Sequence, residues 1–324
     1  MAFYLSPGVY VKEYDLTTIV PGVSTSVGAF SGAFAWGPAN TVVTLSNEVE
    51  LVSTFGKPDA NTFKSFFTCA NFLGYADTLR VVRAINPAVA KNATANGTGM
   101  LIRDRTEYEI NYLGIPAASN TYGMFAARYP GVLGNSLKVS LFADSGNTTT
   151  YVGWGSNEAR PYYEEFDGPP GTSVYAQTNE SSNDEMHIIV VDEGAAITGV
   201  ANTVLEKFAY VSKAPDAKND DGSSNYYVNV INERSRYIYI INHAVNHGTG
   251  MDETSTWGRP TIGKIDYEQE QAIYEASLGS GVDGLPTDAN IEHGYDKFKN
   301  ADEIDISLVM TGAASQTVAE HVLE

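Results

Sequence analysis

The order of apolar patterns over residues 23–88 constrains the fold more than any other feature of the sequence. A strand-like alternation in VSTSVGAFSGAFAWGP and a second strand, NTVVTLS, are followed by two helical patterns and then by a third strand, TLRVVRAI. Strands that alternate with helices are typical of an α/β layer, in which helices cover a sheet. Residues 23–88 are therefore predicted to form an α/β core lobe.

Both predicted helices lie between the second and third of these strands. The first begins after Asn47, which can cap it together with Glu50, and it ends at Gly56. In the second helix an apolar stripe recurs at helical spacing and is expected to face the core: Phe63, Phe66, Phe67, Ala70 and Leu73.

A nearly continuous apolar run, IDISLVMTG, lies close to the end of the sequence. Such a run is typical of a strand buried on both faces of a sheet, and Leu79–Ile85 is the best candidate for a parallel partner of Ile304–Met310. Residues 301–324, which end in the helical pattern AASQTVAEHVLE, are therefore expected to continue the core lobe. With no strand left downstream, the chain is either a fragment or docks this strand onto an earlier α/β layer.

The long middle section, residues 89–300, is predicted to be an inserted β-rich α+β lobe. MHIIVVDEG reads as a strand, and VLEKFAYVS as a strand or a short helix. Residues from about 143 to 183 are rich in Gly, Asn, Ser and Pro, which predicts long exposed polar loops with one hairpin. The predicted fold class is thus α+β and multidomain, a discontinuous α/β core lobe plus the inserted lobe, and a length of 324 residues suits about two domains.

The first 22 residues are predicted to be an extended N-terminal arm. After Pro7 the sequence alternates as a strand does, and Pro21 separates it from the core lobe. An extended segment without a sheet of its own either frays or adds to the sheet edge of another chain, and the local pattern leaves both open. If the arm does add to another chain, the candidate contact residues are Ser6, Pro7, Gly8, Val9, Tyr10 and Val11.

Charge and composition exclude several classes of function. The 20 basic and 39 acidic residues give a net charge of −19, which opposes direct contact with nucleic acid or with an anionic membrane. No apolar stretch is long enough to span a membrane, and the N-terminus has no secretory signal pattern. The single cysteine, Cys69, excludes an internal disulfide and fits a reducing compartment.

Residues 279–284, GSGVDG, match the G-x-G-x-x-G pattern of dinucleotide-binding loops. Such a loop must follow a buried strand and lead directly into a helix, but QEQAIYEAS lacks a β-branched run and the next helix cap is Thr287 or Asp288. Asp283 also places a carboxylate where phosphates would lie. A glycine turn with positive φ angles is therefore predicted, and a Rossmann-like NAD-dependent oxidoreductase is the alternative.

Other catalytic or metal-binding patterns are incomplete. His243 and His247 have helical spacing, but no Glu follows the first histidine and Gly248 would end the helix. DAKNDDGSSN would place Ala217 at the first ligand position of a calcium loop, where a carboxylate is required. The sequence predicts no enzyme, no cofactor and no metal site.

Several segments taken together resemble the contractile bacteriophage tail sheath proteins of the T4 type. YLSPGVYVKEYD resembles their opening, and GAFSGAFAWGPANTVVTLSNEVELVSTFGKP followed by FLGYADTLRVVRAI is closely similar. YPGVLGNSLKVSL, EKFAYVSKAPDAKNDDGSSNYYVNVIN and LGSGVDGLP are also similar, and in the family the last is a turn that leads into the helix before a central strand. An outer β-domain expected near residue 100 is absent or vestigial here. Family chains continue further, so an N-terminal fragment or a C-terminally incomplete chain is expected.

The resemblance implies a structural, late-expressed subunit that polymerises as hexameric rings around the tail tube and contracts to drive the tube through the host envelope. Arms would add strands to neighbouring sheets, and a metastable extended form would shorten without nucleotide hydrolysis. The implied partners are neighbouring sheath subunits, the tail tube protein, and the baseplate and tail terminator proteins, without nucleic acid contact or membrane insertion. The implied location is the tail sheath of the virion, and the host cytoplasm during assembly. A phage-derived injection system and an adhesin are alternatives.

Overall fold

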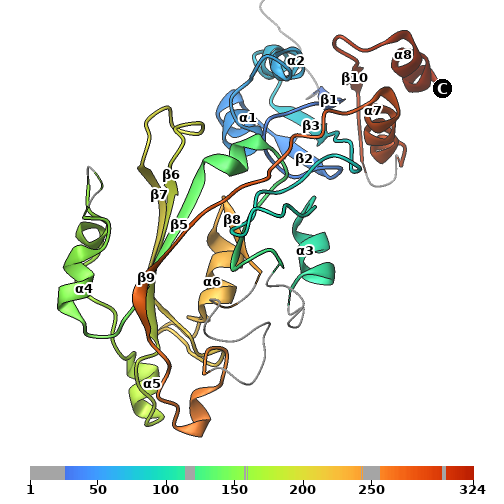
Figure 1. The fold of residues 1–324 in the computed structure, drawn as a ribbon. Helices are drawn as coiled ribbons and strands as arrows, with labels where there is room; N and C mark the ends of the chain where they lie inside the picture. The colour runs from blue at the N-terminus through green and yellow to red at the C-terminus, as the bar shows by residue number, and fades with distance from the viewer. Residues whose placement is uncertain are drawn as a thin grey trace, which may run out of the picture.

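The computed structural model describes residues 26–113, 121–156, 158, 160–241, 243, 256–300 and 304–324. Figure 1 shows two lobes: the first, at the upper right, contains β1, β2, β3 and β10 with α1, α2, α7 and α8, and the second extends below it. Helices and strands in several sheets confirm the α+β class. The predicted arm, residues 1–22, lies outside the described residues.

Strands and helices are interspersed along the described residues. The strands are β1 (Val27–Gly32), β2 (Val42–Leu45), β3 (Thr78–Arg83), β4 (Phe125–Ala127), β5 (Leu137–Ala143), β6 (Glu185–Asp192), β7 (Thr203–Ser212), β8 (Ile238–Ile240), β9 (Glu270–Ser277) and β10 (Leu308–Met310). The α-helices are α1 (Glu48–Phe55), α2 (Phe63–Leu73), α3 (Arg105–Asn111), α4 (Thr148–Gly153), α5 (Val174–Thr178), α6 (Tyr227–Arg234), α7 (Asp288–Tyr295) and α8 (Gln316–Leu323). Among the described residues, no helix has both the length and the apolar character needed to cross a membrane.

The sheet of the first lobe joins segments from both ends of the described chain. Its order is β10-β1-β3-β2, with β1 parallel to both of its neighbours and β2 antiparallel to β3. The register places Gly28 of β1 between Leu79 of β3 and Leu308 of β10. The prediction that Ile304–Met310 and Leu79–Ile85 share one sheet is therefore confirmed.

The position of β10 in that sheet differs from the expectation. Within the described part of the chain β10 pairs with β1 alone, and Leu308 and Val309 are 49% and 40% exposed. The prediction of a strand buried on both faces was wrong. An apolar run reports strand propensity, whereas the position of a strand in its sheet depends on the segments beside and above it.

Helices cover the two faces of this sheet. A Cβ atom on Gly28 would lie 2.5 Å from the ring of Phe72 in α2, whereas the Ser31 hydroxyl donates a hydrogen bond to the Ile291 carbonyl in α7 at 3.0 Å. Because successive residues of a strand point to opposite faces, α2 and α7 lie on opposite sides. The lobe boundary at residue 300 stays a prediction, although α7, which precedes it, packs against the sheet of the first lobe.

Both helices expected after β2 are present, but α2 buries a narrower face than the sequence predicted. Asn47 Oδ1 accepts a hydrogen bond from the Glu50 backbone N–H at 2.9 Å, and α1 ends at Gly56 with φ 77°, as predicted. In α2, however, the buried residues are Phe66 and Cys69, while Phe63 and Phe67 are 44% and 51% exposed. The predicted stripe was too wide, because apolar spacing does not show which side of a stripe meets the sheet.

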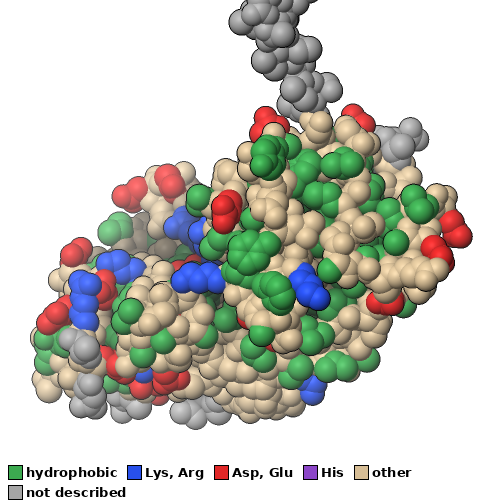
Figure 2. Space-filling view, turned by 90° about the horizontal axis from the view of Figure 1, so that it is seen from above, with side chains coloured by type: hydrophobic (Ala, Val, Ile, Leu, Met, Phe, Trp, Pro, Cys, Tyr) green, Lys and Arg blue, Asp and Glu red, His purple; other side chains and the backbone are tan. Residues whose placement is uncertain are grey.

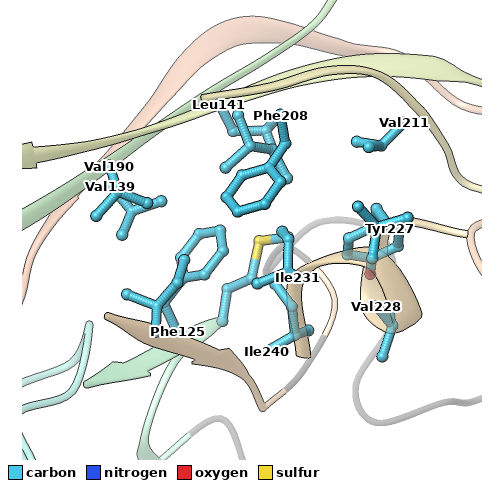
Figure 3. Packing of buried hydrophobic residues seen from close by; sticks show 14 of the residues in the cluster. Phe125, Val139, Leu141, Val190, Phe208, Val211, Tyr227, Val228, Ile231 and Ile240 are labelled. Atoms are coloured by element: carbon cyan, nitrogen blue, oxygen red, sulfur yellow. The ribbon is translucent and has the colours of Figure 1, made fainter. Parts of the chain in front are cut away.

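The main core of the second lobe lies between two sheets and a helix. The antiparallel sheet β7-β6-β5-β9 faces the small sheet β4-β8 and α6. Figure 3 shows Leu141 and Phe208, from the large sheet, pointing toward Ile231 of α6 and Phe125 of β4. This cluster joins strands that are far apart in the sequence.

The segment from about 143 to 183 is not a set of exposed loops. It contains α4 and α5, and Tyr151, Trp154 and Tyr162 are buried in a cluster with Phe142 of β5. The Trp154 indole N–H donates to the Ser140 hydroxyl at 2.7 Å, so its polar atom is satisfied. The loop prediction was wrong, because small polar residues indicate irregular backbone while the aromatic residues among them determine burial.

Candidate functional site

The glycine-rich loop at residues 279–284 lies at the junction of the two lobes. It pairs antiparallel with residues 91–94: Gly279 N–H donates to the Thr94 carbonyl at 3.0 Å and Val282 N–H to the Lys91 carbonyl at 2.8 Å. A Cβ atom on Gly281 would lie 2.4 Å from the Gly131 carbonyl oxygen. The loop therefore packs directly against neighbouring backbone.

This geometry does not fit a dinucleotide site. The preceding strand, β9, is antiparallel to β5, and α7 begins only at Asp288. The turn prediction also needs a correction, because Gly284 has a positive φ of 56° but Gly279 and Gly281 do not, and Ser280 does, at 65°. Gly281 is required by the close approach of Gly131 and not by its own φ angle.

A buried arginine connects the lobes beside this loop. Arg83 is fully buried at the end of β3, and its guanidinium donates to three main-chain carbonyls, those of Phe34 (2.9 Å), Gly37 (2.8 Å) and Pro130 (2.7 Å). Burial lowers the pKa of Arg83 to about 10, and the nearby charge of Asp283 opposes that shift. Asp283, which disfavoured a phosphate site in the sequence, therefore offsets part of the desolvation of this arginine.

Four apolar residues of β10 and α2 are exposed, and we call them the β10 surface: Leu308, Val309, Phe63 and Phe67. Gly312, two residues beyond β10, approaches Thr68 of α2, so the strand and the helix are neighbours. Figure 2 shows hydrophobic side chains spread over the part of the molecule with the first lobe and acidic ones mostly toward its outline. An edge strand offers unpaired backbone N–H and C=O groups to another strand.

The structure does not assemble the other candidate residues of the sequence into a site. Ser6, Pro7, Gly8, Val9, Tyr10 and Val11 lie outside the described residues, as does His247, while His243 is buried and hydrogen-bonds the Tyr227 hydroxyl. Ala217 is also buried, next to Asp216, which accepts from the Thr261 backbone. No cluster of three or more potential metal ligands occurs among the described residues.

Part of the first lobe matches a known protein family in sequence. Residues 25–84, which contain β1, β2, α1, α2 and β3, match the family described as "Tail sheath protein Gp18 domain III N-terminal region". The tail sheath protein of Enterobacteria phage T4 is 46% identical over 90 residues, which are 28% of this chain and 14% of that protein. The tail sheath protein of Salmonella phage ViI is 29% identical over 204 residues, 63% of this chain and 28% of that protein.

The chain thus spans a minor part of the curated relatives that it matches. Among solved structures, the sheath tail protein Lin1278 from Listeria innocua aligns with 91% of this chain and 42% of its own, at 14% identity and a TM-score of 0.43, which is too low to support a conclusion about the fold. These curated relatives are named tail sheath proteins, in agreement with the family that the sequence resembles. In sequence, this chain is thus similar to the tail sheath proteins of bacteriophages.

Proposed function

We propose that the chain is a structural subunit of a contractile tail sheath, which polymerises as hexameric rings around the tail tube and contracts to drive the tube through the host envelope. The match of residues 25–84 to a sheath domain supports this role. The proposed partners are neighbouring subunits, the tail tube protein, and the baseplate and tail terminator proteins. Assembly would take place in the host cytoplasm.

The open side of β10 is the observation that carries the assembly step. This strand belongs to the sheet that the matched region forms, and its outer side has no strand among the described residues. We propose that the N-terminal arm of a neighbouring subunit adds to this edge. Strand addition obtains its affinity from main-chain hydrogen bonds and needs no preformed pocket.

An arm of this kind would also allow neighbouring subunits to stay connected while the sheath contracts. A subunit tethered by its arm stays at high effective concentration beside its neighbour while the packing between them changes. A metastable packing can then convert to a more stable one without a chemical energy source. The net charge of −19 suits a sheath that contacts protein and not the packaged DNA.

Negative-stain electron microscopy of the full-length protein expressed alone tests this function. Striated tubes are expected from the wild type, and no tubes from Val309→Lys, because a lysine on an edge strand prevents the addition of another strand. Val152→Lys is the matched control, since Val152 is 49% exposed on α4 in the second lobe, away from β10. Absence of tubes in the wild type contradicts the function, whereas tubes from Val309→Lys contradict only the assignment of the edge.

A further inference from the structure

A cleft of about 590 Å³ opens between the two lobes, apart from the β10 surface and from the glycine-rich loop. One wall is the end of α1 with Lys57, and the opposite wall is the end of α6 and the segment after it, residues 233–237. Arg128, Tyr129, Leu133, Ala196 and Ile197 also line it. The cleft therefore forms only where the lobes meet.

The floor of the cleft is apolar and aromatic. Trp36 is almost fully buried, and the ring of Tyr129 meets it edge-on with a centroid distance of 5.5 Å. Leu133, Ile197 and Tyr237 are half-buried beside them and line the same cleft. An apolar floor of this kind, with aromatic residues and arginines, is typical of the well-packed centre of a protein interface.

The rim carries positive charge. Lys57, Arg234 and Arg236 are exposed, and in the described part of the chain none of them has a carboxylate within the 4.0 Å of an ion pair. The fourth cation, Arg128, is already engaged, because it donates to the Ser235 carbonyl at 2.5 Å near the end of α6. Glu233 is the one carboxylate among the residues that line the cleft.

The positive charge of this cluster is opposite in sign to the net charge of the chain. Acidic residues outnumber basic ones by 39 to 20, yet the cleft combines four cations with one carboxylate. Lys57, Arg234 and Arg236 form no ion pair among the described residues, although Glu206 lies near Arg236 and Asp221 near Arg234, so part of their charge is available to a binding partner. The expected occupant bears carboxylates at the rim and an apolar side chain that reaches the floor.

The surface of this same chain presents that chemistry. Val49 is 78% exposed between the exposed Glu48 and Glu50, and Tyr75 is 97% exposed two residues before Asp77. We propose that the cleft binds an acidic segment with an exposed apolar side chain from a second copy of this chain. The proposal rests on the proposed function, which requires contacts between subunits.

The symmetry of this contact agrees with a sheath. A cleft on one subunit that binds a different surface of the next subunit is a head-to-tail contact. Repeated head-to-tail contacts generate rings or open helical assemblies, which are the forms proposed for the sheath. The cleft contact is separate from strand addition at β10, because it uses other residues and depends on charge.

Sedimentation velocity of the purified chain tests the cleft contact. Wild-type protein is expected to self-associate at low ionic strength and to dissociate at about 1 M salt, where screening reduces the range of charge interactions to about 3 Å. Arg234→Glu/Arg236→Glu is expected to weaken the association at least about tenfold, because reversed charges at a rim repel the acidic partner. Lys57→Glu, on the opposite wall, is expected to act in the same direction.

Lys218→Glu/Lys297→Glu is the matched control, because it makes the same change in net charge at two exposed positions outside the cleft lining. It is expected to leave association within about twofold of wild type. Thermal unfolding checks that every variant is folded. A wild type that stays monomeric at low salt, or equal effects of cleft and control variants, would overturn the proposal. Sheath tubes from the full-length cleft variant would also overturn it while leaving the proposed function intact.

Discussion

The backbone N–H of Tyr210 donates a hydrogen bond to Nδ1 of His187, at 3.1 Å. This contact places the imidazole proton on Nε2, which donates to the Gly168 carbonyl at 2.8 Å. The ring is buried and stacks on Phe166 with a centroid distance of 4.2 Å. Both nitrogens are satisfied in the neutral form, and burial lowers the pKa of His187 to about 4.

The free energy of unfolding is expected to decrease as the pH is lowered, because of His187. The unfolded chain binds a proton near pH 6.5 and the folded chain only near pH 4, so the unfolded state holds more protons between these values. The free energy of unfolding should therefore decrease by about 3 kcal/mol as the pH falls from about 6.5 to about 4. Urea unfolding at a series of pH values measures this decrease.

The variant His187→Phe is expected to be less stable at neutral pH but to lose most of this pH dependence. His293→Gln is the control, since His293 is exposed and its replacement should leave the slope unchanged. An unchanged slope in His187→Phe would show that other groups account for the acid sensitivity.

Arg83→Lys is expected to destabilise the protein by about 3 kcal/mol, as measured by urea unfolding. An ammonium group cannot reach the three carbonyls that the planar guanidinium joins, so buried acceptors lose their donors. Arg105→Lys, in an exposed pair with Glu109, is expected to change stability by less than about 0.5 kcal/mol. A similar small loss in Arg83→Lys would mean that the lobes do not depend on this residue.

Gly281→Ala is expected to cost about 2 kcal/mol of stability, because its methyl group would overlap the Gly131 carbonyl oxygen. Gly153→Ala in α4 is the control, since nothing lies within 4 Å of the added carbon and alanine favours the helix. Thermal unfolding of both variants makes the comparison. Equal melting temperatures would show that the loop relaxes without loss.

Deletion of residues 1–20 is expected to leave the melting temperature of the monomer nearly unchanged but to prevent the full-length protein from forming ordered sheath. An isolated strand gains little stability within its own subunit. Thermal unfolding and negative-stain microscopy of the deletion measure the two effects. A large drop in melting temperature would assign the arm to its own fold, and normal tubes would show that other contacts hold the sheath together.

The sequence by itself determined the elements whose signals are local. The boundaries of α1 follow from Asn47 and Gly56, because a side-chain cap and a positive φ act within a few residues. The strand TLRVVRAI was also evident, and the segments that resemble sheath proteins indicated the family. The partners of Arg83 had no comparable signal, because its carbonyl acceptors are more than forty residues away in the chain.

Only the tertiary structure decided which surfaces are buried and which stay open. IDISLVM and the Phe stripe of α2 both predicted burial, yet Val309 and Phe67 are exposed, while Trp154 in a polar segment is completely buried. The junction cleft shows the same dependence, since its cations come from the end of α6 and from the segments that follow α1, α6 and β4. Apolar spacing reports the local conformation of the backbone. Exposure and charge clustering depend on distant segments that fold against it.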